Sequence, residues 1–252
     1  MKNAKLNWVR LPLKGAENCR ELGGYNSRYG EQTNWHAFLR SNDMSKLTQE
    51  DILFLKDYGV KTVIDLRGED ELQTHKNLLA NENFCEYHNI PFIAGQVTNM
   101  NFSYEKIFMG DFYVQLLEKN DAVKRIFDCI AQAEEGCIIF HCAAGKDRTG
   151  ILAMLLLGLA GVEKKDILSN YEVTYTNLES IQELAVQNND AKYKDIPKEF
   201  MFSRSEYIQS ALDHILNNYG SVEQYLVSNG IEQDVIERVK GRLLLVADVT
   251  IA

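Results

Sequence analysis

The chain has few of the features that mark linkers or covalent staples. Only three of its 252 residues are proline, and no low-complexity segment or repeat separates one part from another. Its five cysteines include no Cys-x-x-Cys pair, and an odd count favours a reducing compartment over a disulfide framework. The extended chain from Cys137 to Cys142 spans about 16 Å, too far for a disulfide. We therefore expect a single domain, residues 1–252, stabilised by its own core.

Long apolar runs are also missing. The most apolar stretch, residues 151–162, is shorter than the roughly 20 residues that a membrane helix requires. The segment from Met1 to Lys14 carries scattered charges and has no apolar core of signal-peptide length. We therefore expect a cytoplasmic protein without an integral membrane segment. Export by a route that needs no signal peptide stays open.

The charge balance and the histidines argue against further classes. With a formal net charge of −9, the chain lacks the basic footprint that nucleic acid requires, so we expect no nucleic-acid partner. The five histidines show no metal-ligand spacing, and the carboxylates form no cluster typical of a metal cage. We expect neither a metal ion nor another cofactor.

Strands alternate with helices over the first two thirds of the chain. A helix is predicted between a cap at Thr48 and a stop at Gly59, where acidic residues fill the first turn. The wholly apolar run at 137–140 is typical of a strand buried on both faces of a parallel sheet. The other predicted strands lie at 60–66 and 84–90, and the other helices at 104–117, 122–133, 149–159, 166–187, 205–219, 221–228 and 232–245.

This alternation predicts an α/β fold. We expect a central, mostly parallel sheet flanked by helices over about residues 15–162, with the site at the carboxyl ends of the strands. A helical extension with a possible lid would follow over about residues 163–252, as a helical C-terminal third of the same domain.

The chemistry is concentrated in residues 140–150, Phe-His-Cys-Ala-Ala-Gly-Lys-Asp-Arg-Thr-Gly. Five residues separate Cys142 from Arg148, after the apolar strand and before an apolar helix. The N–H groups and dipole at the start of that helix favour negative charge, and Lys146 and Arg148 add positive charge. The thiolate is the nucleophilic form of cysteine. We interpret the segment as a phosphate-binding loop with a nucleophile at its floor.

Each position of this loop has an expected role. Its N–H groups would hold the phosphate oxygens, and Arg148 would grip two of them in a bidentate fork. Thr149 could donate a hydrogen bond to the sulfur, and His141 would support the loop from behind. Gly145 permits a turn that a side chain would hinder. The predicted substrate-binding residues are Ala143, Ala144, Gly145, Lys146 and Thr149.

The loop resembles that of the protein tyrosine phosphatase superfamily. Its Gly-Lys-Asp-Arg-Thr-Gly version is similar to one bacterial branch, which includes the secreted mycobacterial tyrosine phosphatase B and related phosphoinositide phosphatases. The likeness extends to residues 18–25, 39–41, 63–67 and 219–226, although Cys19 stands where the family commonly has an aromatic residue. The resemblance implies a cysteine-dependent phosphatase for phosphotyrosine, with phosphoserine/threonine as further substrates, that acts through a phosphocysteine intermediate.

The general acid, which protonates the leaving oxygen, is the least defined residue. Neither Trp8 nor Trp35 is followed by Pro-Asp, so the mobile Trp-Pro-Asp loop of many tyrosine phosphatases is absent. Asp147 is the first candidate, with a loop-bracing salt bridge as its alternative. Asp65, at the end of a neighbouring strand, is the second. Asp111 is the third, although its position is more typical of a helix cap.

Other charged residues have two interpretations. Arg20, Arg40 and Arg67 could contact a multiply phosphorylated substrate, but we favour salt bridges that tie strands together. Lys146 is shared with phosphoinositide phosphatases, whereas Ala143 stands where they often carry a second lysine. The electrostatic case for a lipid headgroup is therefore partial.

The resemblance also implies extra helices between about residues 175 and 207. Apolar residues at helical spacing are followed there by a polar stretch, 187–193, and by the apolar cluster 200–202 between Lys198 and Arg204. This segment has two interpretations, ordinary core packing and a lid over the phosphate pocket, and the sequence does not decide between them.

Three alternatives to a protein phosphatase are a phosphoinositide phosphatase, a rhodanese-like sulfurtransferase and a non-catalytic phosphate-binding module. The Thr-Gly after Arg148 and the helical C-terminal third argue against the sulfurtransferase. The presence of both Cys142 and Arg148 argues against the binding module. The sequence does not decide whether the partner is a phosphorylated protein or a phosphoinositide. It does not give the oligomeric state either.

Overall fold

The computed structural model describes residues 2–92, 108–118, 121–187 and 201–244, with the backbone alone over 180–187. A five-stranded sheet has the order β1-β2-β5-β3-β4, in which β1 is antiparallel to β2 and the other neighbours are parallel. The strands are β1 Arg20–Glu21, β2 Phe38–Ser41, β3 Val60–Asp65, β4 Glu86–Asn89 and β5 Cys137–His141. The predicted α/β class with a mostly parallel sheet is confirmed.

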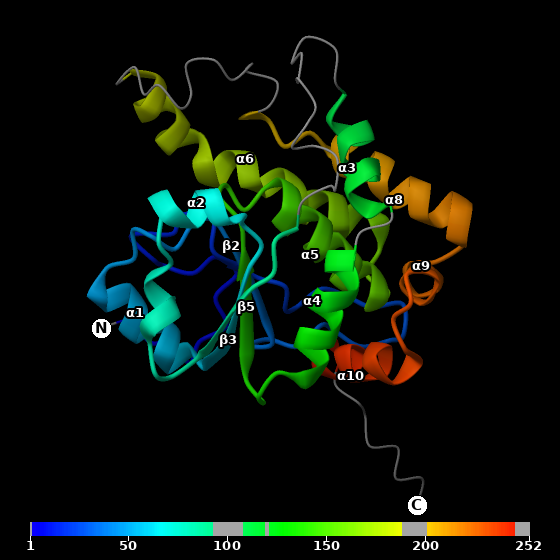
Figure 1. Cartoon of the computed structure of the whole chain (residues 1–252), viewed down its shortest axis with the longest axis horizontal. Helices are drawn as coiled ribbons and strands as arrows, with labels where there is room; N and C mark the ends of the chain where they lie inside the picture. The colour runs from blue at the N-terminus through cyan, green and yellow to red at the C-terminus, as the bar shows by residue number, and fades with distance from the viewer. Residues whose placement is uncertain (1, 93–107, 119–120, 188–200, 245–252) are drawn as a thin grey trace, which may run out of the picture.

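Helices cover both faces of this sheet (Figure 1). Helix α1 lies on one face, and α4, α5 and α10 lie on the other. The helices are α1 Gln49–Tyr58, α2 Glu69–Thr74, α3 Met109–Leu117, α4 Asp121–Gln132, α5 Asp147–Leu159, α6 Lys164–Gln187, α8 Ser205–Tyr219, α9 Val222–Ser228 and α10 Gln233–Leu243, with a 3-10 turn at Leu78–Asn81.

The two apolar faces come from the alternation of side chains along each strand. Ile139 of β5 and Val63 of β3 pack with the α1 side, whereas Ile138 and Ile64 pack with the helices on the other face. All four side chains are fully buried. A strand buried on both faces needs apolar residues at every position, and this explains the unbroken run in β5.

Local signals fix the ends of α1 as predicted. Thr48 accepts a hydrogen bond from the Asp51 N–H at 3.2 Å, and Asp51 accepts one from the Thr48 N–H at 2.9 Å. This reciprocal capping box satisfies two backbone donors that the helix leaves unpaired. Gly59, with φ of 97°, ends the helix in the left-handed conformation that glycine adopts readily.

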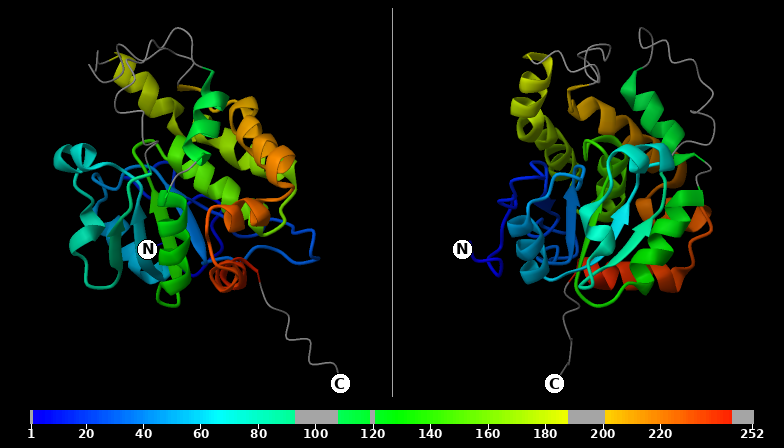
Figure 2. Two further views of the ribbon diagram at one scale, coloured as in Figure 1. Left: turned by 45° about the vertical axis from the view of Figure 1, so that its right-hand side comes forward. Right: turned by 60° about the vertical axis from the view of Figure 1, so that its left-hand side comes forward.

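The helical C-terminal third folds back onto the α/β core (Figure 2). Helix α8 packs against α3, and α10 packs against α4. None of the described helices is long and apolar enough to cross a membrane. All five cysteines are free thiols, including Cys137 and Cys142.

The structure also differs from the sequence expectations. Strands β1 and β2, helix α2 and the 3-10 turn were not predicted, β5 extends one residue further, and α5 begins at Asp147 instead of at 149. Residues 188–200 of the predicted lid segment lie outside the described residues, as does the start of the predicted helix 104–117.

Candidate active site

The loop with Cys142 joins the end of central strand β5 to the first turn of α5. Cys142 is only 2% exposed, so the thiol lies at the bottom of the loop and not on the surface. Gly145 has φ of +66°, and a Cβ there would lie 2.4 Å from the Ser41 carbonyl oxygen. Both the turn and the close approach require glycine, which confirms the turn expected at this position.

The backbone carbonyl groups of the loop accept hydrogen bonds from residues outside the loop. The Ala143 carbonyl accepts from the Asp43 N–H at 2.9 Å, and the Ala144 carbonyl accepts from the Asn18 amide at 3.0 Å. The Gly145 carbonyl accepts from Arg40 at 2.8 Å. In a planar trans peptide the C=O and the following N–H point in opposite directions. The N–H groups of residues 144–146 therefore point away from these partners.

Arg40 and Arg20 hold the loop against α6 without forming salt bridges. Arg40 donates to Asn170 Oδ1 at 2.6 Å, and Arg20 donates to the Asn170 carbonyl and to Thr174 Oγ1, both at 2.8 Å. No ion pair within the described part of the chain involves either arginine, so the expectation of salt bridges is wrong for both. Burial lowers the pKa of Arg40 to about 10. The Nη groups of these buried cations are bound by neutral oxygens, whereas the Nε of each makes no hydrogen bond to the described residues.

Arg67 does form the expected salt bridges. It donates to Asp65 through Nε at 2.9 Å and through Nη2 at 2.6 Å, and it contacts Asp43 at 2.9 Å. Both Arg67 and Asp65 are almost completely buried. The bidentate geometry is that of the strongest charge-assisted pairs.

His141 connects the loop to Asp65. Its Nε2 lies 3.2 Å from Asp65 Oδ2 and 2.7 Å from the Asn77 amide, and its Nδ1 lies 3.2 Å from the Cys142 carbonyl. Tyr87 also donates to Asp65 Oδ2 at 3.1 Å. Burial alone would raise the pKa of Asp65, but the hydrogen bonds from Arg67 and His141 hold it well below its usual range.

Arg148 has a partner that the sequence analysis missed. Its Nη1 and Nη2 donate to the two carboxylate oxygens of Glu71, at 2.6 and 2.8 Å. Glu71 also accepts from the Gly68 N–H at 2.9 Å, so α2 holds this carboxylate in place. The one local signal was a glutamate at the third position of a short helix, where it can reach back to the first N–H groups.

Asp147, in the first turn of α5, has different partners from those of Asp65. Tyr113 donates to its Oδ1 at 2.5 Å, and Lys146 Nζ lies 3.4 Å from the same oxygen. The Asp147 side chain is 28% exposed. Asp111 is exposed in the first turn of α3, whose cap residue is Phe108, so Asp111 is not the cap.

Two further loop residues were predicted to bind substrate. Lys146 is almost buried, and its ammonium donates to the Phe202 carbonyl at 3.4 Å. The Thr149 hydroxyl is buried and makes no hydrogen bond to the described residues, Cys142 among them, so the expected bond to the sulfur is not formed here and a role for Thr149 during turnover stays a prediction. No group of three His, Cys, Asp or Glu side chains that could hold a metal ion is found among the described residues.

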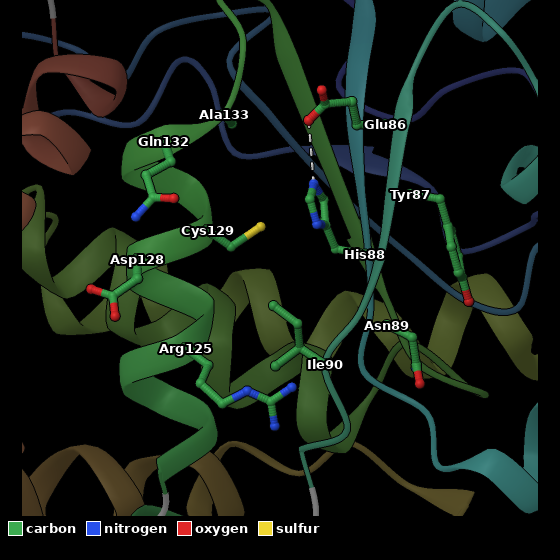
Figure 3. Close-up of a pocket in the computed structure, with 10 residues that line it drawn as sticks. All are labelled: Glu86, Tyr87, His88, Asn89, Ile90, Arg125, Asp128, Cys129, Gln132 and Ala133. Carbon is green, nitrogen blue, oxygen red and sulfur yellow. Dashed lines mark ion pairs between the residues drawn. The ribbon is translucent and has the colours of Figure 1, made fainter.

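A separate cavity of about 620 Å³ lies between edge strand β4 and helix α4. Figure 3 shows Arg125 and Cys129 of α4 facing His88 and Ile90 of β4, with His88 paired to Glu86. Its lining includes no residue of the loop 140–150. The cavity is therefore distinct from the candidate active site.

Comparisons with known proteins agree with this geometry. Residues 11–245 match the model of the tyrosine phosphatase family, so the chain belongs to that family and is a phosphatase. A tyrosine-protein phosphatase of Nostoc commune is 35% identical over 217 residues, which cover 82% of this chain and 74% of that protein.

Two other relatives carry similar names. A protein of Cupriavidus necator, also named as a tyrosine-protein phosphatase, is 27% identical over 90% of this chain and 86% of its own length. The triple specificity protein phosphatase PtpB of Mycobacterium tuberculosis is 29% identical over 54% of this chain and 55% of its own. These matches confirm the resemblance on which the sequence analysis relied.

Proposed function

We propose that the protein hydrolyses phosphotyrosine in proteins through a phosphocysteine intermediate on Cys142. The observation that carries this proposal is the outward binding of the loop carbonyls by Asn18, Arg40 and Asp43. Because the carbonyls point toward these partners, the N–H groups of residues 144–146 point the other way, beside the N-terminus of α5. Such a concave set of donors is complementary to a phosphate and to the charge of its transition state.

The reaction has two steps. The Cys142 thiolate attacks phosphorus, the S–P bond forms, and the P–O bond to tyrosine breaks while Asp147 protonates the leaving oxygen. Water then attacks the phosphocysteine, Asp147 takes back its proton, and the thiolate leaves. Arg148, oriented by Glu71, would stabilise the charge on the phosphoryl oxygens in both transition states.

The surroundings of the two candidate aspartates favour Asp147 as the acid. Asp65 is completely buried and held by Arg67 and His141, and its lowered pKa keeps it ionised at neutral pH. A group that stays ionised does not donate a proton, so we assign Asp65 a bracing role. Asp147 lies inside the loop and is partly exposed, as proton transfer to a bound substrate requires.

Aromatic residues near the loop support an aryl phosphate as the substrate. The rings of Phe202 and Tyr175 lie 5.1 Å apart, and the Arg204 guanidinium lies 5.3 Å from the Phe202 ring centroid. The Phe202 carbonyl binds Lys146 of the loop, so this aromatic group lies beside the phosphate cradle. Stacking against such rings favours a flat phenyl group over the short chain of phosphoserine.

A phosphoinositide is the second candidate substrate, and Lys146 is the residue that favours it. Its contacts with Asp147 and with the Phe202 carbonyl argue against a headgroup role, since both would have to be exchanged for the lipid phosphate. Hydrolysis of phosphoserine and phosphothreonine, at lower rates than phosphotyrosine, stays a prediction. The single-domain organisation, the cytoplasmic location and the lid also stay predictions.

The test compares Cys142→Ser with Cys129→Ser, which changes a half-buried thiol in α4. Hydrolysis of p-nitrophenyl phosphate should be lost in Cys142→Ser and kept in Cys129→Ser. Acid-quenched wild-type enzyme should carry phosphate on the peptide with Cys142. A panel of phosphotyrosine, phosphoserine and phosphoinositide substrates should rank phosphotyrosine first. Substantial activity in Cys142→Ser would contradict the covalent mechanism, and a preference for phosphoinositides would contradict the substrate.

A further inference from the structure

Two buried tyrosines form a chain of hydroxyl groups that ends on Asp147. The Tyr113 hydroxyl of α3 lies 2.5 Å from Asp147 Oδ1, and the Tyr171 hydroxyl of α6 lies 2.6 Å from that of Tyr113. Both tyrosines are almost completely buried, and their rings meet edge to face at a centroid distance of 6.0 Å. Side chains from three helices, α3, α5 and α6, therefore form one hydrogen-bonded chain that ends on Asp147 Oδ1.

The direction of these hydrogen bonds follows from the number of protons. Each phenol carries one proton, and the Asp147 carboxylate can only accept. Tyr113 therefore donates to Asp147, and Tyr171 donates to Tyr113. Burial is the main cause that raises the pKa of both tyrosines well above the usual value, so both stay neutral donors.

The two carboxyl oxygens of Asp147 differ in their hydrogen-bond partners. Tyr113 and Lys146 both contact Oδ1, and no hydrogen bond within the described residues uses Oδ2. While Tyr113 donates to Oδ1, the proton that Asp147 takes up lies on Oδ2, the oxygen without a donor among the described residues. The phenol fixes both the rotation of the carboxyl group and the oxygen that carries the transferable proton.

We propose that Tyr113, supported by Tyr171, is a positioning residue that presents Asp147 Oδ2 to the leaving oxygen of the substrate. This inference rests on the proposed role of Asp147 as the general acid. In the first step the proton moves from Oδ2 to the leaving oxygen while the phosphoryl group moves to Cys142 Sγ. The new carboxylate keeps its hydrogen bond from Tyr113 until water returns a proton in the second step.

The first experiment uses Tyr113→Phe, which removes one oxygen and keeps the ring. The turnover number is measured on a poor leaving group, phenyl phosphate, and on an activated one, p-nitrophenyl phosphate. Only the poor leaving group depends strongly on proton donation. Tyr113→Phe should lower turnover of phenyl phosphate about tenfold or more, with a much smaller loss on p-nitrophenyl phosphate. Tyr171→Phe should show the same pattern with about a threefold loss.

Tyr225→Phe provides a matched control. Tyr225 is also buried, and its hydroxyl donates to the Leu117 carbonyl at 2.7 Å, away from Asp147. Removing it deletes a buried hydrogen bond of similar length at the C-terminal end of α3. Tyr225→Phe should lower the melting temperature as Tyr113→Phe does, but it should leave the ratio of the two turnover numbers unchanged.

A double-mutant cycle with Asp147→Asn separates the two proposals. If Tyr113 acts through Asp147, then Tyr113→Phe should cause no further loss on phenyl phosphate in the Asp147→Asn background. Equal losses on both substrates in Tyr113→Phe, or full additivity in the cycle, would overturn the positioning role while Asp147 remains the acid. If Asp147→Asn itself shows no dependence on the leaving group, the acid assignment falls and the positioning role with it. Should Tyr113→Phe not fold, Tyr171→Phe in the same cycle decides the question.

Discussion

Asp65, the last residue of β3, contacts His141 at the start of the loop that carries Cys142, and Asp147 lies at the end of that loop; the two aspartates differ in burial and in partners. Asp65 is completely buried, and Arg67 donates two hydrogen bonds to it while His141 lies 3.2 Å away. Asp147 is 28% exposed, and a neutral phenol, that of Tyr113, donates the shortest hydrogen bond to it. Asp65 lies in the interior against an arginine and a histidine, whereas Asp147 lies nearer the surface between the Tyr113 phenol and the Lys146 ammonium, whose Nζ is 3.4 Å from Oδ1.

From this difference we infer a structural role for Asp65 and a proton-transferring role for Asp147. A buried carboxylate with an arginine partner keeps its charge and fixes the strand and loop that it joins. The partly exposed Asp147 carboxyl group is held in place by a neutral phenol at 2.5 Å and by a longer contact with Lys146, and it lies where a bound substrate could reach it. Pairs of titratable groups in such contrasting environments are the usual basis for separating structural from proton-transferring roles.

The largest effect is expected for Asp147→Asn on a poor leaving group. The amide cannot donate the proton that the leaving oxygen requires, so turnover of phenyl phosphate should fall by about 10²–10⁴. Turnover of p-nitrophenyl phosphate should fall much less, and the basic limb of the pH–rate profile should flatten. Equal losses on both substrates would instead support the alternative that Asp147 only braces the loop through Lys146.

Asp65→Asn should act on stability instead. It leaves Arg67 buried without its bidentate partner, and breaking a buried pair in this way costs about 3–5 kcal/mol of unfolding free energy. Urea unfolding monitored by tryptophan fluorescence measures the change. The matched control is Asp43→Asn, because Asp43 contacts the same guanidinium at 2.9 Å but is 20% exposed. If both variants lost the same small amount, the buried pair would not be the brace inferred here.

Asp65 should also make the unfolding free energy depend on pH under acidic conditions. Because its folded-state pKa lies below the unfolded value of about 3.9, Asp65 stabilises the fold above that pH. This contribution is lost as the pH falls below about 4, with a slope of up to about 1.4 kcal/mol per pH unit. Unfolding free energies measured between neutral pH and pH 3 should show this slope in the wild type. An equally steep slope in Asp65→Asn would assign it to other groups.

The loop could be predicted from sequence because its signals are local. The apolar run of β5, the left-handed turn at Gly145 and the first turn of α5 all lie within about a dozen consecutive residues. Strands β1 and β2 carry no such signal. They are two and four residues long, and Arg20 pairs with Arg40 only because the sheet brings distant segments together. Short strands of mixed polarity lack the periodicity that a sequence prediction needs.

The partners of the site residues lie far away along the chain, so the sequence analysis could not find them. Tyr113 is 34 residues from Asp147, and Glu71 is 77 residues from Arg148. Nothing about a tyrosine within a helix, or a glutamate in a short one, indicates which loop residue it will reach. The same holds for Arg20 and Arg40, whose neutral partners on α6 replaced the carboxylates that we expected.

The smallest effect is expected for Glu71→Gln, which tests the second carboxylate beside the loop. Glutamine can still cap α2 and accept one hydrogen bond from Arg148, but the charged, bidentate contact at 2.6 and 2.8 Å is lost. Charged hydrogen bonds exceed neutral ones by about 1 kcal/mol, so kcat/KM should fall about fivefold to tenfold. The loss should be equal for phenyl and p-nitrophenyl phosphate, because Arg148 contacts the phosphoryl group that both substrates share. Glu69→Gln, which removes the same charge from an exposed position in the first turn of α2, should have no effect. If Glu71→Gln bound inorganic phosphate more tightly than the wild type, Glu71 would compete with the substrate for the guanidinium instead of orienting it.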